Sequence, residues 1–234
     1  MTRPLFASLA LALIALAVPR ASDAAAYALR PWLSAAATYA RYDMGDVNRD
    51  IDSFNASLLP DDPKMDRIEG AAGLALAAGM DFPNHLGVRF AYQRFPAWSE
   101  VSIGGDRIEY NFAGNAFIAG AEFQVPLGES LDLSLGGEAG IVSLAGKVGI
   151  AIAALGSGSI DAHGNGPLAA GVVRLTNWWG DRYALEFAGA VRSARVAQVT
   201  TDRDLIVYNA DGTKYSVDWS GIGVSAAFKV ALPY

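Results

Sequence analysis

The sequence contains no cysteine, only two histidines among 234 residues, and few charges, since Asp, Glu, Lys and Arg together make up 18% of the chain. The absence of cysteine excludes a small secreted domain that depends on disulfides. The formal net charge is −6, and an acidic chain of this kind gives no reason to expect nucleic-acid binding.

The chain also has no apolar run of the length a membrane-spanning helix needs, although 52% of its residues are hydrophobic. The longest run, Leu5 to Val18, follows Arg3 and precedes the small residues Ala24-Ala25-Ala26. This order is typical of a signal peptide, and we expect residues 1–26 to be a signal peptide and residues 27–234 to form one domain. Only helices and closed barrels satisfy the backbone in lipid, so a β-barrel is the remaining membrane option.

Side chains alternate with period two in eight segments, as they do along β-strands. In the last segment, Ile222, Val224, Phe228 and Val230 share one face, and Gly223, Ser225 and Lys229 share the other. The eight expected strands are Trp32–Tyr42, Ile68–Met80, Leu86–Phe95, Ile108–Val125, Leu131–Ala145, Leu168–Trp178, Tyr183–Val196 and a final strand within Val217–Tyr234.

The expected connections alternate between long and short, beginning with a long one. The first is predicted to contain a short helix, because Val47, Ile51, Phe54 and Leu58 recur at helical spacing, with Asp46 as its N-cap. Pro96–Asp106 and Gly146–Pro167 are expected to be loops, and the sequence leaves the structure of Val148–Leu155 open. Aromatic residues gather near strand ends, where rings at two membrane interfaces are expected.

Two orientations of the faces compete, a lipocalin-like soluble barrel with the apolar face inside or a membrane barrel with that face in lipid. The composition of the polar face favours the membrane barrel. This face consists of small residues and isolated charges, whereas a water-facing surface carries many long charged side chains. Eight strands enclose an interior that side chains can just fill. The expected lumen charges are Glu69, Arg89, Glu122, Asp132, Glu138, Arg174, Glu186, Arg192 and Lys229.

This pattern resembles the small eight-stranded outer-membrane protein family with OmpA-type, OmpX-type and OmpW-type barrels. The fold class that follows is all-β, an eight-stranded antiparallel up-and-down transmembrane β-barrel with a short helix in its first long loop. The resemblance implies a bacterial outer-membrane location, periplasmic termini, and contact with lipid and lipopolysaccharide. It also implies recognition of the last strand by the barrel assembly machinery, through Phe228, Val230, Leu232 and Tyr234; Pro233 departs from the usual pattern. We further expect a monomer.

Catalytic and metal motifs are incomplete. His163-Gly164-Asn165 resembles the His-x-Ser-Asn signature of lipid A deacylases but has Asn165 in place of the serine nucleophile. His85 falls in a predicted turn. Asp46–Asp52 resembles the start of a calcium loop but has Ile51 and Ser57 where glycine and glutamate are required. We therefore expect no catalytic residue, metal or cofactor, although loop acids binding divalent cations stays a hypothesis.

Three functions remain open. The first is a structural or surface-interaction barrel with a filled lumen that acts through four external loops. The second, implied by the OmpW-type resemblance, is a narrow channel for small or apolar solutes, and the third is a lipid-modifying enzyme. In the channel hypothesis, lumen arginines such as Arg174 exchange carboxylate partners.

Overall fold

The computed structural model describes residues 29–152 and 156–233. The expected signal peptide, its cleavage site and Tyr234 lie outside this part of the chain. Within it, no helix is long and apolar enough to cross a membrane.

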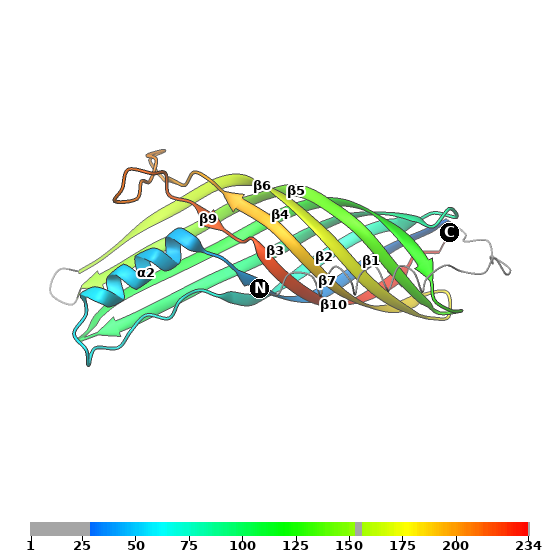
Figure 1. Ribbon diagram of the computed structural model, residues 1–234, viewed down its shortest axis with the longest axis horizontal. Coiled ribbons are helices and arrows are strands. Elements are labelled where there is room, and N and C mark those ends of the chain that lie inside the picture. Colours follow the sequence, from blue (N-terminus) through cyan, green and yellow to red (C-terminus); the bar gives the residue numbers. More distant parts are fainter. Residues whose placement is uncertain (1–28, 153–155, 234) are drawn as a thin grey trace, which may run out of the picture.

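Eight long antiparallel strands form a closed barrel (Figure 1). They are β1 (Arg30–Tyr42), β2 (Gly70–Asp81), β3 (Leu86–Ile103), β4 (Asp106–Pro126), β5 (Leu131–Ile152), β6 (Gly156–Trp179), β7 (Tyr183–Val196) and β10 (Gly221–Ala231). Each pairs with the next in the ring, and β10 lies between β7 and β1. The predicted closure of the last strand on the first is confirmed, with Trp32 opposite Ala231 and Tyr42 opposite Gly221. Pro233 lies beyond the end of β10, as predicted.

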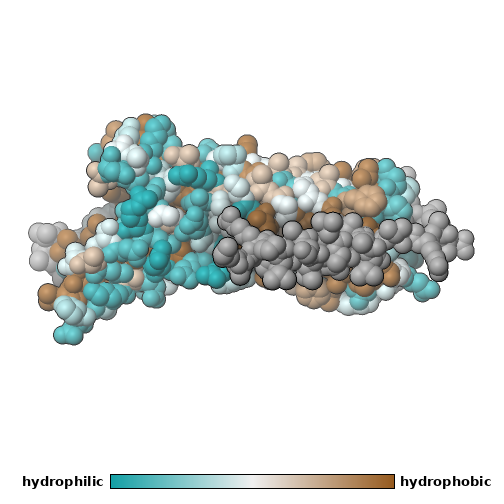
Figure 2. Space-filling view, in the orientation of Figure 1, coloured by the Kyte–Doolittle hydropathy of each residue, from teal (hydrophilic) through white to brown (hydrophobic). Residues whose placement is uncertain are grey.

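Alternation along the strands places large apolar side chains on the outside. Leu76, Phe90, Phe117 and Val191 are each at least 60% exposed. Many of the positions beside them face inward and are small or polar, such as Ala75, Arg89, Ala116 and Arg192. Figure 2 shows apolar residues over the barrel and polar residues over the part that carries α2 (Gly45–Ser57). The barrel therefore has its apolar face outside, the reverse of a soluble domain, and the lipocalin-like alternative is excluded.

The two ends of the barrel differ. Three tight turns, at residues 82–85, 127–130 and 180–182, join strands at one end, which we call the turn end. The other, the loop end, carries α2, the 197–220 connection with β8 (Thr200–Thr201) and β9 (Val217–Asp218), and the outer parts of four strands.

Two of the expected long loops are strands. β3 and β4 continue to a turn at Gly104-Gly105, whose φ angles of +58° and +98° suit glycine, so the prediction of a loop at Pro96–Asp106 is wrong. The prediction for Gly146–Pro167 is also wrong, because β5 runs to Ile152 and β6 begins at Gly156. The strands continue because their inner face stays apolar and buried, through Ala97, Val101, Phe112 and Leu144.

The predicted helix exists as α2 and turns Val47 and Ile51, both 0% exposed, toward the sheet. Phe54 packs against the buried apolar residues that Val47 and Ile51 contact, and Leu58 lies just beyond the helix. The prediction that Asp46 caps the helix is wrong. Met44 is the N-cap, in the left-handed conformation and without a side-chain cap, because the Asp46 carboxylate is bound to Ser216 in another connection.

Candidate functional site

The turn-end half of the lumen is filled by a network of charged side chains, which we call the lumen network. It consists of seven side chains that face inward from seven strands, namely Asp81, Arg89, Glu122, Glu138, Arg174, Glu186 and Lys229. Buried charges are tolerated when they are paired. Each member has at least one opposite charge within 4.0 Å.

Glu186 and Arg174 are the centres of this network. Glu186, 2% exposed, accepts a hydrogen bond from Arg89 Nη1 at 2.9 Å and lies 3.9 Å from Lys229 Nζ. Arg174 Nη1 donates to Glu122 at 2.6 Å, and its Nη2 donates to Glu138. Because charges from several strands share partners, the network cross-links the barrel through its interior.

Small residues make room for the long ones. Gly120 lies opposite both Arg89 on β3 and Glu138 on β5, and a Cβ atom there would press against the Glu138 side chain. Eight strands leave little interior space. Large and small residues must therefore alternate around the barrel as well as along each strand.

Two tryptophans complete the turn end of the lumen. Trp32 Nε1 donates to Asp81 at 2.9 Å, and Lys229 Nζ lies 3.9 Å from the Trp32 ring centroid, a cation–π contact. Trp178 Nε1 donates to Asp132 at 3.1 Å. Gln124 donates a second hydrogen bond to Asp81 at 2.7 Å.

Most of the charges expected in the lumen are brought together there. Arg89, Glu122, Glu138, Arg174, Glu186 and Lys229 join the lumen network; Asp132 lies beside it on Trp178, and Arg192 lies further toward the loop end, beside Trp219. Glu69 does not join, contrary to expectation. Its side chain is 64% exposed and pairs with the exposed Arg41 at 3.5 Å, because Glu69 precedes β2, where strand alternation has not begun.

Asp81 was not among the expected lumen charges, because the expected strand ended at Met80 and Asp81 fell in the turn that follows it. It is the last residue of β2 and continues the inward set of Ala75, Ala77 and Gly79. If the period-two pattern is continued two residues beyond Gly79, it places Asp81 on the inner face.

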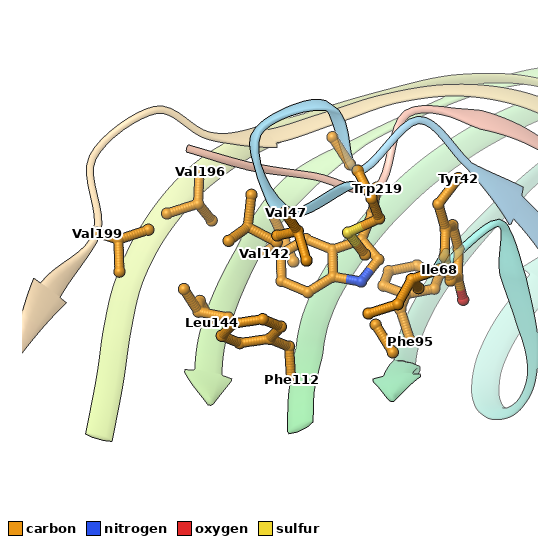
Figure 3. Packing of buried hydrophobic residues seen from close by; sticks show 14 of the residues in the cluster. Tyr42, Val47, Ile68, Phe95, Phe112, Val142, Leu144, Val196, Val199 and Trp219 are labelled. Atoms are coloured by element: carbon orange, nitrogen blue, oxygen red, sulfur yellow. The ribbon is translucent and has the colours of Figure 1, made fainter. Parts of the chain in front are cut away.

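The loop-end half of the lumen holds an apolar cluster, which we call the loop-end core (Figure 3). Trp219, 0% exposed, lies at its centre, with Val47 of α2 on one side and Val142, Phe112 and Phe95 of the sheet around it. Several aromatic residues expected at membrane interfaces are buried instead, namely Tyr42, Phe95, Phe112, Trp178 and Trp219. Strand parity places Tyr42, Phe95, Phe112 and Trp178 on the inner face, and Trp219 lies in the short segment between β9 and β10.

Hydrogen bonds tie α2 to the last connection across the loop-end core. The Asp46 carboxylate accepts from Ser216 N at 2.9 Å and Ser216 Oγ at 2.7 Å. Burial raises the pKa of Asp46, but the hydrogen bonds from Ser216 outweigh it, so this pKa is lowered. Burial raises the pKa of Asp50 despite its hydrogen bond with Tyr215, and burial also raises the pKa of Tyr215.

The residues of the possible enzyme site do not assemble. His163 lies in β6 on the outer face, not in a loop, with its Nε2 3.8 Å from the exposed Asp204. Asn165 accepts a hydrogen bond from Ser143. Among the described residues there is no cluster of three or more His, Cys, Asp or Glu side chains placed to hold a metal ion.

Two residues of the expected assembly signal, Phe228 and Val230, lie on β10, and Leu232 follows its end. Phe228 is 46% exposed and stacks on Tyr183, with ring centroids 5.9 Å apart. Val230 and Leu232 continue the same parity. Recognition of this strand by an assembly machinery stays a prediction.

No family model matches the chain, and no curated protein matches it. Solved structures similar to it include Neisserial surface protein A (10% identity, TM-score 0.49, covering 86% of this chain and 97% of that one). The attachment invasion locus protein Ail of Yersinia pestis, solved with a heparin analogue, is also similar (16% identity, TM-score 0.45, covering 87% and 97%). So is OprG of Pseudomonas aeruginosa (11% identity, TM-score 0.43, covering 88% and 95%). The chain itself shows the strand pairing, the apolar outer face and the charged lumen, and its fold is an eight-stranded antiparallel up-and-down β-barrel.

Proposed function

We propose that the protein is a closed barrel of the bacterial outer membrane whose loop end is an interaction surface outside the cell. The apolar outer face supports the membrane location, since strands crossing lipid alternate apolar-out and polar-in. The pairing of Trp32 with Ala231 places both described ends of the chain at the turn end. Short turns face the periplasm in such barrels, so periplasmic termini follow from the proposal.

The closed lumen is supported by two barriers in series. The lumen network fills the turn-end half and the loop-end core fills the other, with the Trp219 side chain fully buried. While both are in place they obstruct the described lumen, which favours a structural or surface role over transport.

Single-channel recording in planar bilayers tests this closure. We expect no stable unitary conductance from the wild-type protein. The narrow-channel alternative requires steps whose size changes in Arg174→Gln or Glu138→Gln, with the exposed Glu69→Gln as the matched control. Conductance steps that change in these variants would contradict the closed barrel and support the narrow channel.

The observation that carries the surface role is the free edge of β6. Its first six residues, Gly156–Asp161, are all exposed. They pair with β5 alone among the described residues, whereas β8 and β7 cover the later parts of β6. An uncovered strand edge is a template for pairing with another extended chain. Ile150 and Ile160, 44% and 54% exposed, lie beside this edge.

The interaction class that this edge supports is strand addition by an extended polypeptide. A suitable probe is reduced, carboxymethylated α-lactalbumin, an unfolded chain, immobilised and presented with cells that produce the protein. We expect the cells to bind it. Val148 and Ile160 face each other, so replacing residues 149–159 with Asn-Gly retains a hairpin and removes the edge.

This shortened variant should lose binding. Ile160→Thr, the matched control, keeps the main-chain edge and should retain most of it, because strand addition depends on backbone hydrogen bonds. Equal binding by the shortened variant and the wild type contradicts the proposal.

A further inference from the structure

A small chamber separates the lumen network from the loop-end core. Its volume is about 60 Å³. Alanines make up much of its wall, together with Thr38, Gln93 and Ser225. Three guanidinium groups line it, those of Arg89, Arg174 and Arg192.

Arg192 is the charge in this chamber that forms no ion pair within 4.0 Å among the described residues, and Glu138 is the carboxylate that acts on it from further away. It extends from β7 and is 8% exposed. Its Nε donates to the Trp219 carbonyl oxygen at 3.3 Å, and its guanidinium carbon lies 4.1 Å from the Phe95 ring centroid. No carboxylate among the described residues forms an ion pair with it, and its Nη2 has no acceptor among them. Such a buried cation is costly unless something negative lies beside it.

The other two arginines also bring buried donors, although Arg174 Nε lies 3.5 Å from Glu186 Oε1 and Glu186 Oε2 is itself buried without a donor among the described residues. The Nε atoms of Arg89 and Arg174 are also buried without a hydrogen-bond acceptor among the described residues. Glu138 is the single carboxylate that lines the chamber. It already accepts from Arg174 Nη2 and lies 4.0 Å from Arg89 Nε.

We propose that this chamber is a binding site for a small monovalent anion, with Arg192 Nη2 as its main ligand. The Thr38 and Ser225 hydroxyls supply further donors, and Arg89 and Arg174 supply positive charge. The volume restricts the ligand to a halide or an anion of a few atoms, because sites for metabolite-sized ligands enclose about 300 Å³ or more. The anion compensates the Arg192 charge inside a low-dielectric wall.

Crystals of the protein refolded in sodium bromide, in place of chloride, provide the direct test. Refolding in the salt lets the ion enter before the loop-end core closes. We expect an anomalous bromide peak within hydrogen-bonding distance of Arg192 Nη2. Density without anomalous signal at that position, in the wild-type protein, identifies water and overturns the proposal, whatever the variants do.

Thermal unfolding in detergent micelles tests the anion site in solution and allows the wild type to be compared with variants. Chloride, compared with gluconate at the same ionic strength, should raise the wild-type midpoint by about 2 to 4 °C, because a ligand bound only by the folded state stabilises it. Arg192→Gln should abolish this difference between the salts. Arg41→Gln makes the same change at an exposed pair and should keep it. A chloride effect of equal size in Arg192→Gln contradicts an anion site at this residue.

Discussion

Replacing Glu186 with glutamine should destabilise the barrel more than the removal of any exposed charge. Glutamine keeps the shape of the side chain and removes only its charge. Glu186 lies 2.9 Å from Arg89 Nη1, 3.5 Å from Arg174 Nε and 3.9 Å from Lys229 Nζ. Three buried cations therefore lose a shared counter-ion at once.

The size of the effect follows from the partners that each cation retains. Arg174 keeps Glu122 and Glu138, and Lys229 keeps Asp81 at 3.5 Å. Among the described residues, Arg89 keeps a single ion-pair partner, Glu138, at 4.0 Å. One inadequately paired buried charge costs about 3 to 5 kcal/mol, and we expect the lower end, about 3 kcal/mol, because Glu138 remains near.

Urea unfolding in lipid vesicles, followed by tryptophan fluorescence and by gel mobility without boiling, measures this loss. Glu69→Gln is the matched control, and it should lose less than about 1 kcal/mol because its ion pair is exposed. The double variant Arg89→Met, Glu186→Gln should recover part of the loss, because the poorly paired cation is removed with its partner. Equal stability of Glu186→Gln and Glu69→Gln would refute the account of the lumen network.

Three further predictions concern the loop end. Trp219→Ala removes the central side chain of the loop-end core and should cost about 3 to 5 kcal/mol in urea unfolding, whereas the exposed Trp98→Ala should cost far less. Because the pKa of Asp46 is lowered in the folded state, the stabilisation by its carboxylate is complete above the usual aspartate pKa and is lost as pH falls through the lower folded pKa. Hydrogen exchange of α2 in the wild type should therefore accelerate below about pH 4. In Asp46→Asn the helix is already undocked, so its exchange should show no acceleration in this pH range. Gly105→Ala places a Cβ at a φ of +98° and should destabilise the β3–β4 hairpin by about 1 kcal/mol, detected as local hydrogen exchange while β10 keeps its protection.

The sequence predicted the faces of the strands well because a strand alternates its side chains with period two regardless of its neighbours. Parity placed Arg174, Glu186 and Lys229 on one face and Phe228 on the other, and the small, sparsely charged polar set indicated that the first face is the inside. The same rule failed at Glu69, which lies one residue outside its strand. The end of a strand is set by whether its residues gain more from pairing with the next strand or from a loop conformation. The local sequence predicts that outcome poorly.

Loop positions were harder to predict than strands. Pro96, Gly104 and the Gly-rich residues near Gly156 are local signals of a loop. The strands nevertheless continue because α2 and Trp219 cover their inner face, and that burial comes from segments far away in the chain. Asp46 shows the same limit, since its position favoured an N-cap while its partner, Ser216, is 170 residues away.

The sequence by itself determined that the chain forms an eight-stranded barrel with an apolar face outside and charges inside, because composition and period-two alternation are local properties. Only the tertiary structure decided the height at which each inward residue lies. Arg174 and Arg192 share the inward face of neighbouring strands, yet one lies among carboxylates and the other beneath Trp219. The stagger between paired strands sets those heights. It divides the interior into a lumen network, a chamber and an apolar core.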